Sequence, residues 1–176
     1  VTGSHNPSEY NGFKMVLGKH SFFSDDIKSF QNIIENKKLE KKQGKSEDFN
    51  IIDNYVERIL KNISLSKKLK ISWDIGNGSM GVIINQLISK LQNTENILLN
   101  KEVDGKFPNH HPDPTVPENM KQLIKSVKEN NCDLGLAFDG DGDRLGVVDN
   151  LGNIIWADQY MLILCSEIIK IYKNPK

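Results

Sequence analysis

The sequence predicts an α/β fold, built as three-layer α/β/α domains with mixed, largely parallel sheets, one of them partial and one complete. From residue 69 onward, short apolar runs of strand length alternate with segments in which apolar residues recur at helical spacing. A glycine-rich turn at residues 74–78 joins the first of these runs to a helix. Residues 1–62 contain one clear strand and cannot close a sheet alone, so we expect residues 63–176 to form the complete domain.

The N-terminal part is expected to contain one strand and two helices. The apolar run at residues 13–17 predicts the strand, which ends at Gly18. Ser24 precedes two aspartates and is expected to cap the first helix. Residues 37–50 are rich in lysine and polar side chains, which indicates an exposed linker before a second helix over residues 52–60. The apolar positions of the first helix are Ile27, Phe30, Ile33 and Ile34.

The complete domain is expected to alternate strands with helices. Strands are predicted at residues 69–74, 97–99, 134–138, 145–148 and 154–156, with a hairpin turn at 150–153. Helices are predicted where apolar residues recur every three or four positions, over residues 80–91, 120–127 and 161–169. Thr115, with Glu118 three residues later, predicts a capping box at the start of the middle helix.

Composition excludes several classes of protein. The 23 basic and 23 acidic residues cancel, so we expect no nucleic-acid and no membrane partner. Two cysteines make neither a disulfide framework nor a zinc set, which favours a reducing, cytoplasmic location. There is no run of 18 apolar residues and no basic-then-apolar signal pattern. The sequence starts without methionine inside a loop of functional appearance, so we expect a fragment of a longer protein.

Three carboxylates at alternate positions, Asp139, Asp141 and Asp143, directly follow an apolar strand. Alternate side chains can converge on one point, and their mutual repulsion is best relieved by a hard divalent cation. An EF-hand does not fit, because its sixth position would be Arg144 rather than glycine and its twelfth Asn150 rather than glutamate. We therefore expect Mg²⁺ here, with Arg144 suited to a phosphate; a turn without metal is the alternative.

Ser4 lies in the loop TGSHNP at residues 2–7, between a glycine and a histidine. Asn6 and Pro7 predict a turn directly after it. A solvent-exposed turn serine is the simpler interpretation of this loop alone. A nucleophilic or phosphate-carrying serine becomes the better interpretation when the loop is considered together with the acidic stretch.

Four stretches carry a family resemblance: residues 2–7 (TGSHNP), 10–14 (YNGFK), 105–114 (GKFPNHHPDP) and 139–144 (DGDGDR). They resemble the α-D-phosphohexomutases, the superfamily of bacterial phosphomannomutases and phosphoglucomutases, over essentially the whole chain. In this resemblance the first stretch corresponds to the active-site phosphoserine loop and the last to the magnesium loop.

The resemblance implies a four-domain enzyme. Residues 1–62 would be the end of domain I, with the phosphoserine loop, and residues 63–176 would be domain II, with the magnesium loop. The start of domain I with its basic residue, the sugar-recognition loop of domain 3 and the phosphate-binding loop of domain 4 would lie outside these residues. We therefore expect the 176 residues alone to be inactive.

The resemblance also implies a mechanism. Phosphorylated Ser4 would donate its phosphoryl group to a mannose or glucose phosphate, and the bisphosphorylated sugar would return its other phosphate to Ser4. The net reaction interconverts a hexose 1-phosphate and a hexose 6-phosphate. Mg²⁺ would be held by a phosphoryl oxygen on Ser4 and by Asp139, Asp141 and Asp143.

The remaining catalytic roles fall to three cationic or titratable side chains. Arg144 would clamp a phosphate through two parallel N–H donors. Lys14 and His5 are the candidates for proton transfer to and from the sugar hydroxyl. Lys14 is preferred, because it matches the lysine that follows the serine loop in the family.

Two other functions remain open. An apolar strand that ends in Asp-x-Asp-Gly also resembles the haloacid-dehalogenase-type phosphotransferases, in which Asp139 would be the nucleophile. The chain could instead be a non-catalytic module that binds magnesium and phosphate. His110 and His111 suggest a metal site with Asp113, but the spacing is too short for zinc, and a structural role at a domain interface is expected.

Overall fold

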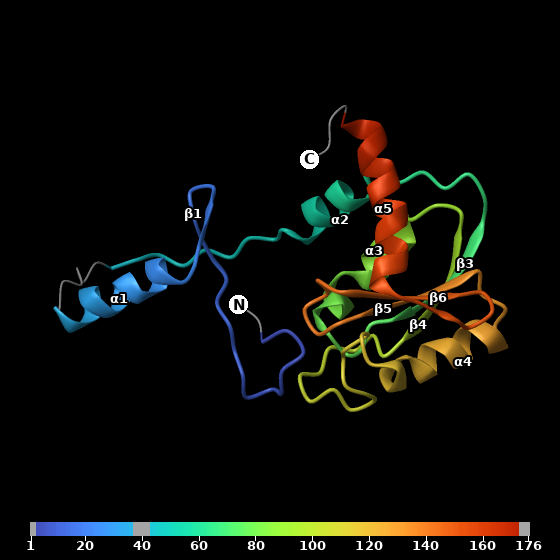
Figure 1. Ribbon diagram of the computed structural model, residues 1–176, viewed down its shortest axis with the longest axis horizontal. Helices are drawn as coiled ribbons and strands as arrows, with labels where there is room; N and C mark the ends of the chain where they lie inside the picture. Colours follow the sequence, from blue (N-terminus) through green and yellow to red (C-terminus); the bar gives the residue numbers. More distant parts are fainter. Residues whose placement is uncertain (1–2, 37–42, 173–176) are drawn as a thin grey trace.

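A mixed sheet of five strands is the centre of the computed structural model, which describes residues 3–36 and 43–172 (Figure 1). The strands are β3 (Leu69–Asp74), β4 (Thr94–Leu99), β5 (Leu134–Phe138), β6 (Leu145–Asp149) and β7 (Ile154–Ile155), in the order β4-β3-β5-β6-β7. β3 is parallel to both β4 and β5, whereas β6 is antiparallel to β5 and to β7. The expected mixed sheet is confirmed, with its parallel part confined to the β4-β3-β5 side.

Helices cover both faces of this sheet and complete three layers (Figure 1). One face is covered by α4 (Lys121–Glu129), which follows the short 3₁₀ helix η2 (Pro117–Met120). The other side carries α2 (Ile52–Leu60), the 3₁₀ helix η1 (Ser79–Val82), α3 (Ile84–Lys90) and α5 (Ala157–Ile171). Each face has its own apolar core, so the parallel strands of the sheet are packed on both sides.

The two cores share the central strands. Ile71 and Trp73 of β3 pack with Val56 of α2 and with α3, while Val148 of β6 packs with Leu123 and its neighbours on α4. Buried apolar side chains at these positions supply the main driving force for the fold. Cys132 belongs to the α4 core, where burial raises the pKa of its thiol.

One polar contact crosses the α4 core. Ser72 of β3 is fully buried, and its Oγ lies 2.8 Å from the Oγ of Ser126 on α4, which is 7% exposed. Each hydroxyl supplies the partner that the other needs when both are removed from water. The pair therefore fixes the position of α4 along β3.

The N-terminal residues form a separate arm (Figure 1). β1 (Met15–Leu17) pairs antiparallel with β2 (His20–Phe22), and α1 (Asp25–Glu35) follows. Phe22 stacks on Phe30 with ring centroids 5.0 Å apart, yet no residue of α1 is buried. The arm reaches the sheet domain through the loop that precedes β1.

Several expected boundaries agree with the structure and two expected caps do not. β3 and β5 have the predicted bounds, and the hairpin between β6 and β7 is formed. The hydroxyl of Ser24 makes no cap, because the residue has a φ of 51° and only its carbonyl oxygen bonds the helix. The capping box is wrong too, since Thr115 bonds Asp113 and the helix opens at Pro117. The expected linker lies partly outside the described residues, which omit 37–42.

The helix expected over residues 80–91 is divided. It consists of η1 followed by α3, which begins at Ile84. The last helix begins earlier than expected, because the side chain of Gln159 accepts a hydrogen bond from the backbone N–H of Trp156 at 2.9 Å. In the part of the chain that the structure describes, we find no helix of the length and apolarity needed to cross a membrane.

A charged contact holds the long loop before η2 to the end of β3. His110 Nε2 lies 2.9 Å from Oδ2 of the buried Asp74, and its Nδ1 lies 2.9 Å from the carbonyl oxygen of His111. Both ring nitrogens face acceptors, which suits the protonated imidazolium. The hydrogen bond to Asp74 raises the pKa of His110 more than burial lowers it. Asn100 and the Gly76 N–H satisfy the other oxygen of Asp74.

We expect the Ser72–Ser126 pair to be energetically coupled. Ser126→Ala should cost about 1–3 kcal/mol of unfolding free energy, because it leaves the Ser72 hydroxyl buried without its partner. The double variant S72A/S126A should cost less than the sum of the two single variants. Chemical denaturation of all four proteins measures this, and additive costs would contradict the coupling.

The His110–Asp74 contact should make stability depend on pH. Because the pKa of His110 is raised in the folded chain, its contribution is complete below the unfolded value of about 6.5 and disappears as pH rises through the folded value. The melting temperature of His110→Gln should therefore lie furthest below that of the original chain near pH 6 and approach it near about pH 9. A gap that stays constant or widens with pH would exclude this role.

Candidate active site

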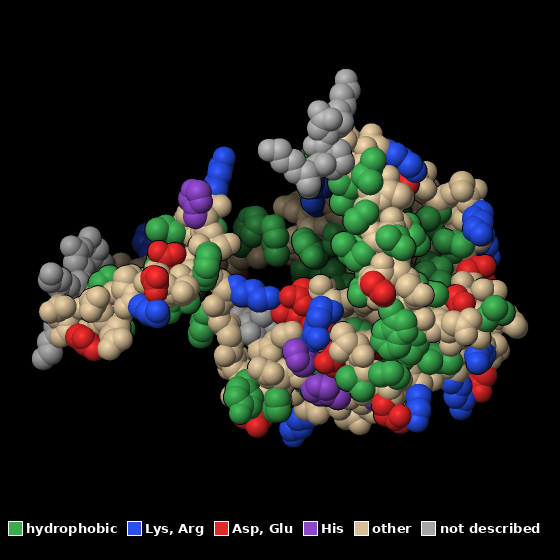
Figure 2. All heavy atoms as spheres, in the orientation of Figure 1, with side chains coloured by type: hydrophobic (Ala, Val, Ile, Leu, Met, Phe, Trp, Pro, Cys, Tyr) green, Lys and Arg blue, Asp and Glu red, His purple; other side chains and the backbone are tan. Residues whose placement is uncertain are grey.

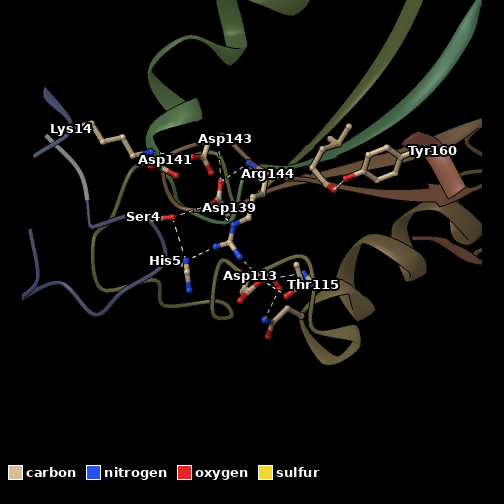
Figure 3. A network of polar contacts seen from close by, with 12 residues as sticks. Ser4, His5, Lys14, Asp113, Thr115, Asp139, Asp141, Asp143, Arg144 and Tyr160 are labelled. Carbon is tan, nitrogen blue, oxygen red and sulfur yellow. Dashed lines mark hydrogen bonds and ion pairs between the residues drawn. The ribbon is translucent and has the colours of Figure 1, made fainter. Parts of the chain in front are cut away.

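The acidic loop connects β5 to β6 at the carboxyl end of the parallel strands (Figure 3). Asp139, Asp141 and Asp143 each place a carboxylate oxygen within 4.8 Å of the others. Gly142 has a φ of 76°, a backbone conformation that glycine adopts without a steric penalty. The tight reversal at this glycine lets the three alternate side chains converge.

Asp139 is the most constrained residue of the loop. Its side chain is fully buried, and Oδ1 accepts backbone hydrogen bonds from Asp143 at 3.0 Å and from Arg144 at 3.1 Å. Burial raises the pKa of Asp139, but hydrogen bonds from Arg144 and Ser4 lower it further, so its pKa lies below the ordinary value. Asp139 is therefore held as an anion despite its burial.

Asp141 and Asp143 are less completely paired. Lys14 Nζ lies 3.0 Å from Asp143 Oδ2 and 3.6 Å from Asp141 Oδ2. The hydrogen bond to Asp143 is the largest cause of the raised pKa of Lys14, so the amine is a cation. Among the described residues, Asp141 Oδ1 is a buried side-chain oxygen without a hydrogen-bond partner. A buried acceptor of this kind is costly unless something else binds it.

Ser4 reaches this loop from the other end of the sequence. Its Oγ donates a hydrogen bond to Asp139 Oδ2 at 3.0 Å and lies 3.2 Å from Nδ1 of His5. Ser4 has a φ of 55°, which is uncommon for a residue with a side chain. Gly140 permits the approach, because a Cβ at that position would overlap the carbonyl oxygen of Ser4. The two loops therefore pack backbone against backbone.

Arg144 links these groups through all three of its guanidinium nitrogens. Nε donates to Asp139 Oδ2 at 2.9 Å, Nη1 lies 3.3 Å from Asp113 Oδ1, and Nη2 donates to His5 Nδ1. Arginine has no acceptor, so Nδ1 of His5 must supply the lone pair in this contact. Burial lowers the pKa of Arg144, but the hydrogen bond to Asp139 and the charge of Asp113 raise it further.

The structure brings most of the candidate residues together. Ser4, His5, Lys14, Arg144 and the three aspartates of the acidic loop form one contact network, in which Lys14 is the most exposed member. Figure 2 shows basic, acidic and histidine side chains gathered where the N-terminal arm meets the sheet domain. Thr2 of the serine motif lies outside the described residues.

The histidine pair of the central motif takes no part in the acidic cluster. His110 is bound to Asp74, and the ring of His111 lies 6.0 Å from that of His5 in an edge-on arrangement. Asp113 is a site residue that the sequence does not reveal, because beside His110 and His111 its position suggests only a metal ligand. Its contact with Arg144 joins residues 31 positions apart, and no local pattern indicates such a pair.

Comparisons with known proteins identify the family of the chain. Residues 53–152 match the family model described as phosphoglucomutase/phosphomannomutase, alpha/beta/alpha domain II. The chain is 46% identical to a phosphomannomutase/phosphoglucomutase of Pseudomonas putida and 41% identical to a phosphoglucomutase of Neisseria gonorrhoeae, in each case over 99% of its length. It spans 37% and 38% of those two proteins, little more than a third of the curated relatives it matches.

A solved structure gives the same result at the level of the fold. A phosphoglucomutase/phosphomannomutase family protein of Burkholderia thailandensis superposes with a TM-score of 0.89 at 43% identity, covering 96% of this chain and 37% of that one. Since the family model alone covers more than half of the 176 residues, the chain belongs to the phosphoglucomutase/phosphomannomutase family of the phosphohexomutase superfamily.

Proposed function

We propose that these residues carry the phosphoserine and magnesium loops of a phosphohexomutase, an intramolecular phosphotransferase of the isomerase class. The enzyme interconverts hexose 1-phosphate and hexose 6-phosphate, with mannose or glucose phosphate as substrate, in cytoplasmic carbohydrate metabolism. The observation that carries the proposal is the 3.0 Å hydrogen bond between Ser4 Oγ and Asp139, 135 residues apart in sequence. It unites a hydroxyl nucleophile with three carboxylates and an arginine at one point.

The donor set of the acidic loop fits Mg²⁺. All its candidate ligand atoms are carboxylate oxygens, which are the ligands of hard divalent cations. One of them, the buried Asp141 Oδ1, receives no hydrogen bond from the described residues. Asp139, Asp141 and Asp143 would hold the ion, together with a phosphoryl oxygen on Ser4. When bound, the ion withdraws charge from the phosphoryl group and makes the serine oxygen a better leaving group.

The reaction proceeds by transfer of a phosphoryl group from Ser4. The bond between phosphorus and Ser4 Oγ breaks, a new bond forms to the sugar hydroxyl oxygen, and that hydroxyl loses its proton. The bisphosphorylated sugar turns over at the site and returns its other phosphate to Ser4 by the reverse step. The transition state of such a transfer is loose and spreads its charge, so positioned cations supply most of the catalysis.

Arg144, Lys14 and His5 supply the positioned charge and the proton transfer. Arg144 directs Nη2 toward His5, beside Ser4, where it can neutralise phosphoryl oxygens. Lys14 is a cation beside Asp143, so it is prepared to donate a proton to an oxygen that leaves. Nδ1 of His5 carries a lone pair and faces Ser4, so the imidazole is the candidate to accept the proton that the sugar hydroxyl loses.

The geometry argues against Asp139 as the nucleophile of a haloacid-dehalogenase-type enzyme. Both of its oxygens accept hydrogen bonds, from two backbone N–H groups, the guanidinium of Arg144 and the hydroxyl of Ser4. A carboxylate that is buried and fully solvated by donors is a weak nucleophile. A non-catalytic module that binds magnesium and phosphate would need no serine hydroxyl at hydrogen-bond distance from the acidic loop. The contact between Ser4 and Asp139 therefore favours the enzyme over such a module.

The remaining domains of the same enzyme are the expected partner. The relatives are longer than this chain, and the α5 side chains Leu162 and Ile163 are 73% and 65% exposed. Apolar side chains also lie open along the N-terminal arm (Figure 2). A helix that is apolar all round is typical of one buried inside a larger protein, so further domains would cover these surfaces.

Ser4→Ala should abolish the phosphoenzyme in the full-length protein that contains these residues, because no Oγ remains to carry the phosphoryl group. Mutase turnover of glucose 1-phosphate should fall by at least about 1,000-fold. Ser8→Ala, in the same exposed loop, is the matched control and should retain both. Labelled phosphate that persists on the Ser4 variant would refute the assignment, and release of that label by alkaline hydroxylamine would identify an aspartyl phosphate instead.

Asp141→Asn should weaken the response to magnesium, because the amide removes one anionic ligand while keeping the shape of the side chain. We expect the Mg²⁺ concentration for half-maximal mutase activity to rise by roughly 10–100-fold. Glu102→Gln removes an exposed carboxylate outside the loop and should leave the Mg²⁺ response as it is. An identical Mg²⁺ curve for the Asp141 variant would exclude Asp141 as a ligand.

A further inference from the structure

Asp113 contacts the active-site arginine from outside the acidic loop. Its side chain is 14% exposed, and Oδ1 lies 3.3 Å from Arg144 Nη1. Figure 3 shows the two side chains directed toward each other, with Asp113 supplied by the loop before η2. The proposed phosphoryl transfer and the proposed magnesium site make no use of this carboxylate.

Asp113 is itself fixed before it meets the arginine. The same Oδ1 accepts a hydrogen bond from Thr115 Oγ1 at 2.7 Å and from the Thr115 backbone N–H at 3.0 Å. The carbonyl oxygen of Asp113 accepts a hydrogen bond from the side chain of Asn119 at 2.9 Å. These bonds hold both the carboxylate and its backbone, so Asp113 is a rigid anchor rather than a mobile surface acid.

Arg144 needs such an anchor. A guanidinium on a flexible side chain loses rotamer freedom when it is ordered, and its donors are useful only when their plane is correctly oriented. Asp139 anchors Nε, but Asp139 also belongs to the acidic cluster and accepts the hydroxyl of Ser4. Asp113 anchors Nη1 independently of that cluster, and two separate anchors define the guanidinium plane. Nη2 is then directed at His5.

We propose that Asp113 is a positioning residue that orients the guanidinium of Arg144 toward the Ser4–His5 loop, with Thr115 holding its carboxylate in place. The role in catalysis rests on the proposed phosphoryl transfer. The orientation of Arg144 does not rest on that transfer, so the orientation and the role in catalysis can be tested separately.

The orientation is measured by NMR of the guanidinium group in the 176-residue chain. The chain contains two arginines, Arg58 and Arg144, so Arg58 is an internal reference. A held guanidinium gives separate Nη1 and Nη2 signals, whereas free rotation averages them. In Asp113→Ala we expect rotation of Arg144 to accelerate by about tenfold or more, the factor that corresponds to one charge-assisted hydrogen bond. Unchanged Arg144 signals in that variant would overturn the proposal.

Asp104→Ala is the matched control. Asp104 lies in the same loop and makes the same kind of turn, with Oδ1 accepting a hydrogen bond from the Lys106 N–H at 2.9 Å. It should leave the Arg144 signals unaltered. Asp113→Asn keeps an acceptor oxygen, so rotation of the Arg144 guanidinium should be slower in D113N than in D113A. Equal rotation rates in these two variants would contradict a role for the acceptor oxygen of residue 113. Arg144 mobility that rises equally in D104A would show loop disruption and would also overturn the proposal.

Catalysis is tested by a double-variant cycle in the full-length protein. D113A should lower kcat by roughly 10–100-fold through misplacement of Arg144, with KM and the Mg²⁺ response nearly unchanged. In an R144A background, D113A should cause little further loss, because the two residues act as a unit. Equal losses in both backgrounds would contradict action through Arg144. An absence of mutase turnover in the original protein would instead refute the proposed function and leave the NMR result to decide the orientation.

Discussion

The buried carboxylate of Asp139 is the interaction on which the site depends. It accepts hydrogen bonds from Ser4, near the start of the sequence, and from Arg144 and the backbone of its own loop. A buried anion is stable only when donors surround it, so these bonds are required by the burial itself. The same requirement draws the serine loop against the acidic loop, and the proposed phosphoryl transfer depends on this contact.

The sheet provides the rigid part of this arrangement. β3 and β5 are parallel neighbours, so their carboxyl ends lie together, and both Asp74 and Asp139 occupy that edge. Asp74 holds the long loop through His110, and Asp139 holds the N-terminal loop through Ser4. These two buried aspartates therefore fix two irregular segments against the carboxyl end of the sheet. The candidate site lies in the loops, but the strands set the positions of these loops.

Charge balance explains why so many polar side chains meet in a small volume. The three aspartates of the acidic loop would repel one another, and Lys14 and Arg144 offset part of this repulsion. The buried oxygen of Asp141 remains without a donor from the described residues, and the proposed cation site rests on this oxygen. Asp113 completes the balance on the far side of the arginine. The polar side chains of the site are thus arranged so that each charge lies beside one of opposite sign.

The sequence by itself determined the α/β class, the bounds of β3 and β5 and the two motifs of the candidate site, because apolar periodicity and short motifs are local signals. Only the tertiary structure decided which side chains meet. The bonds of Asp139 to Ser4, of Asp113 to Arg144 and of His110 to Asp74 span 135, 31 and 36 positions. Thr115 is an example: its local pattern predicts a helix cap, in which its hydroxyl would accept a backbone hydrogen bond, but in the folded loop this hydroxyl donates to Asp113.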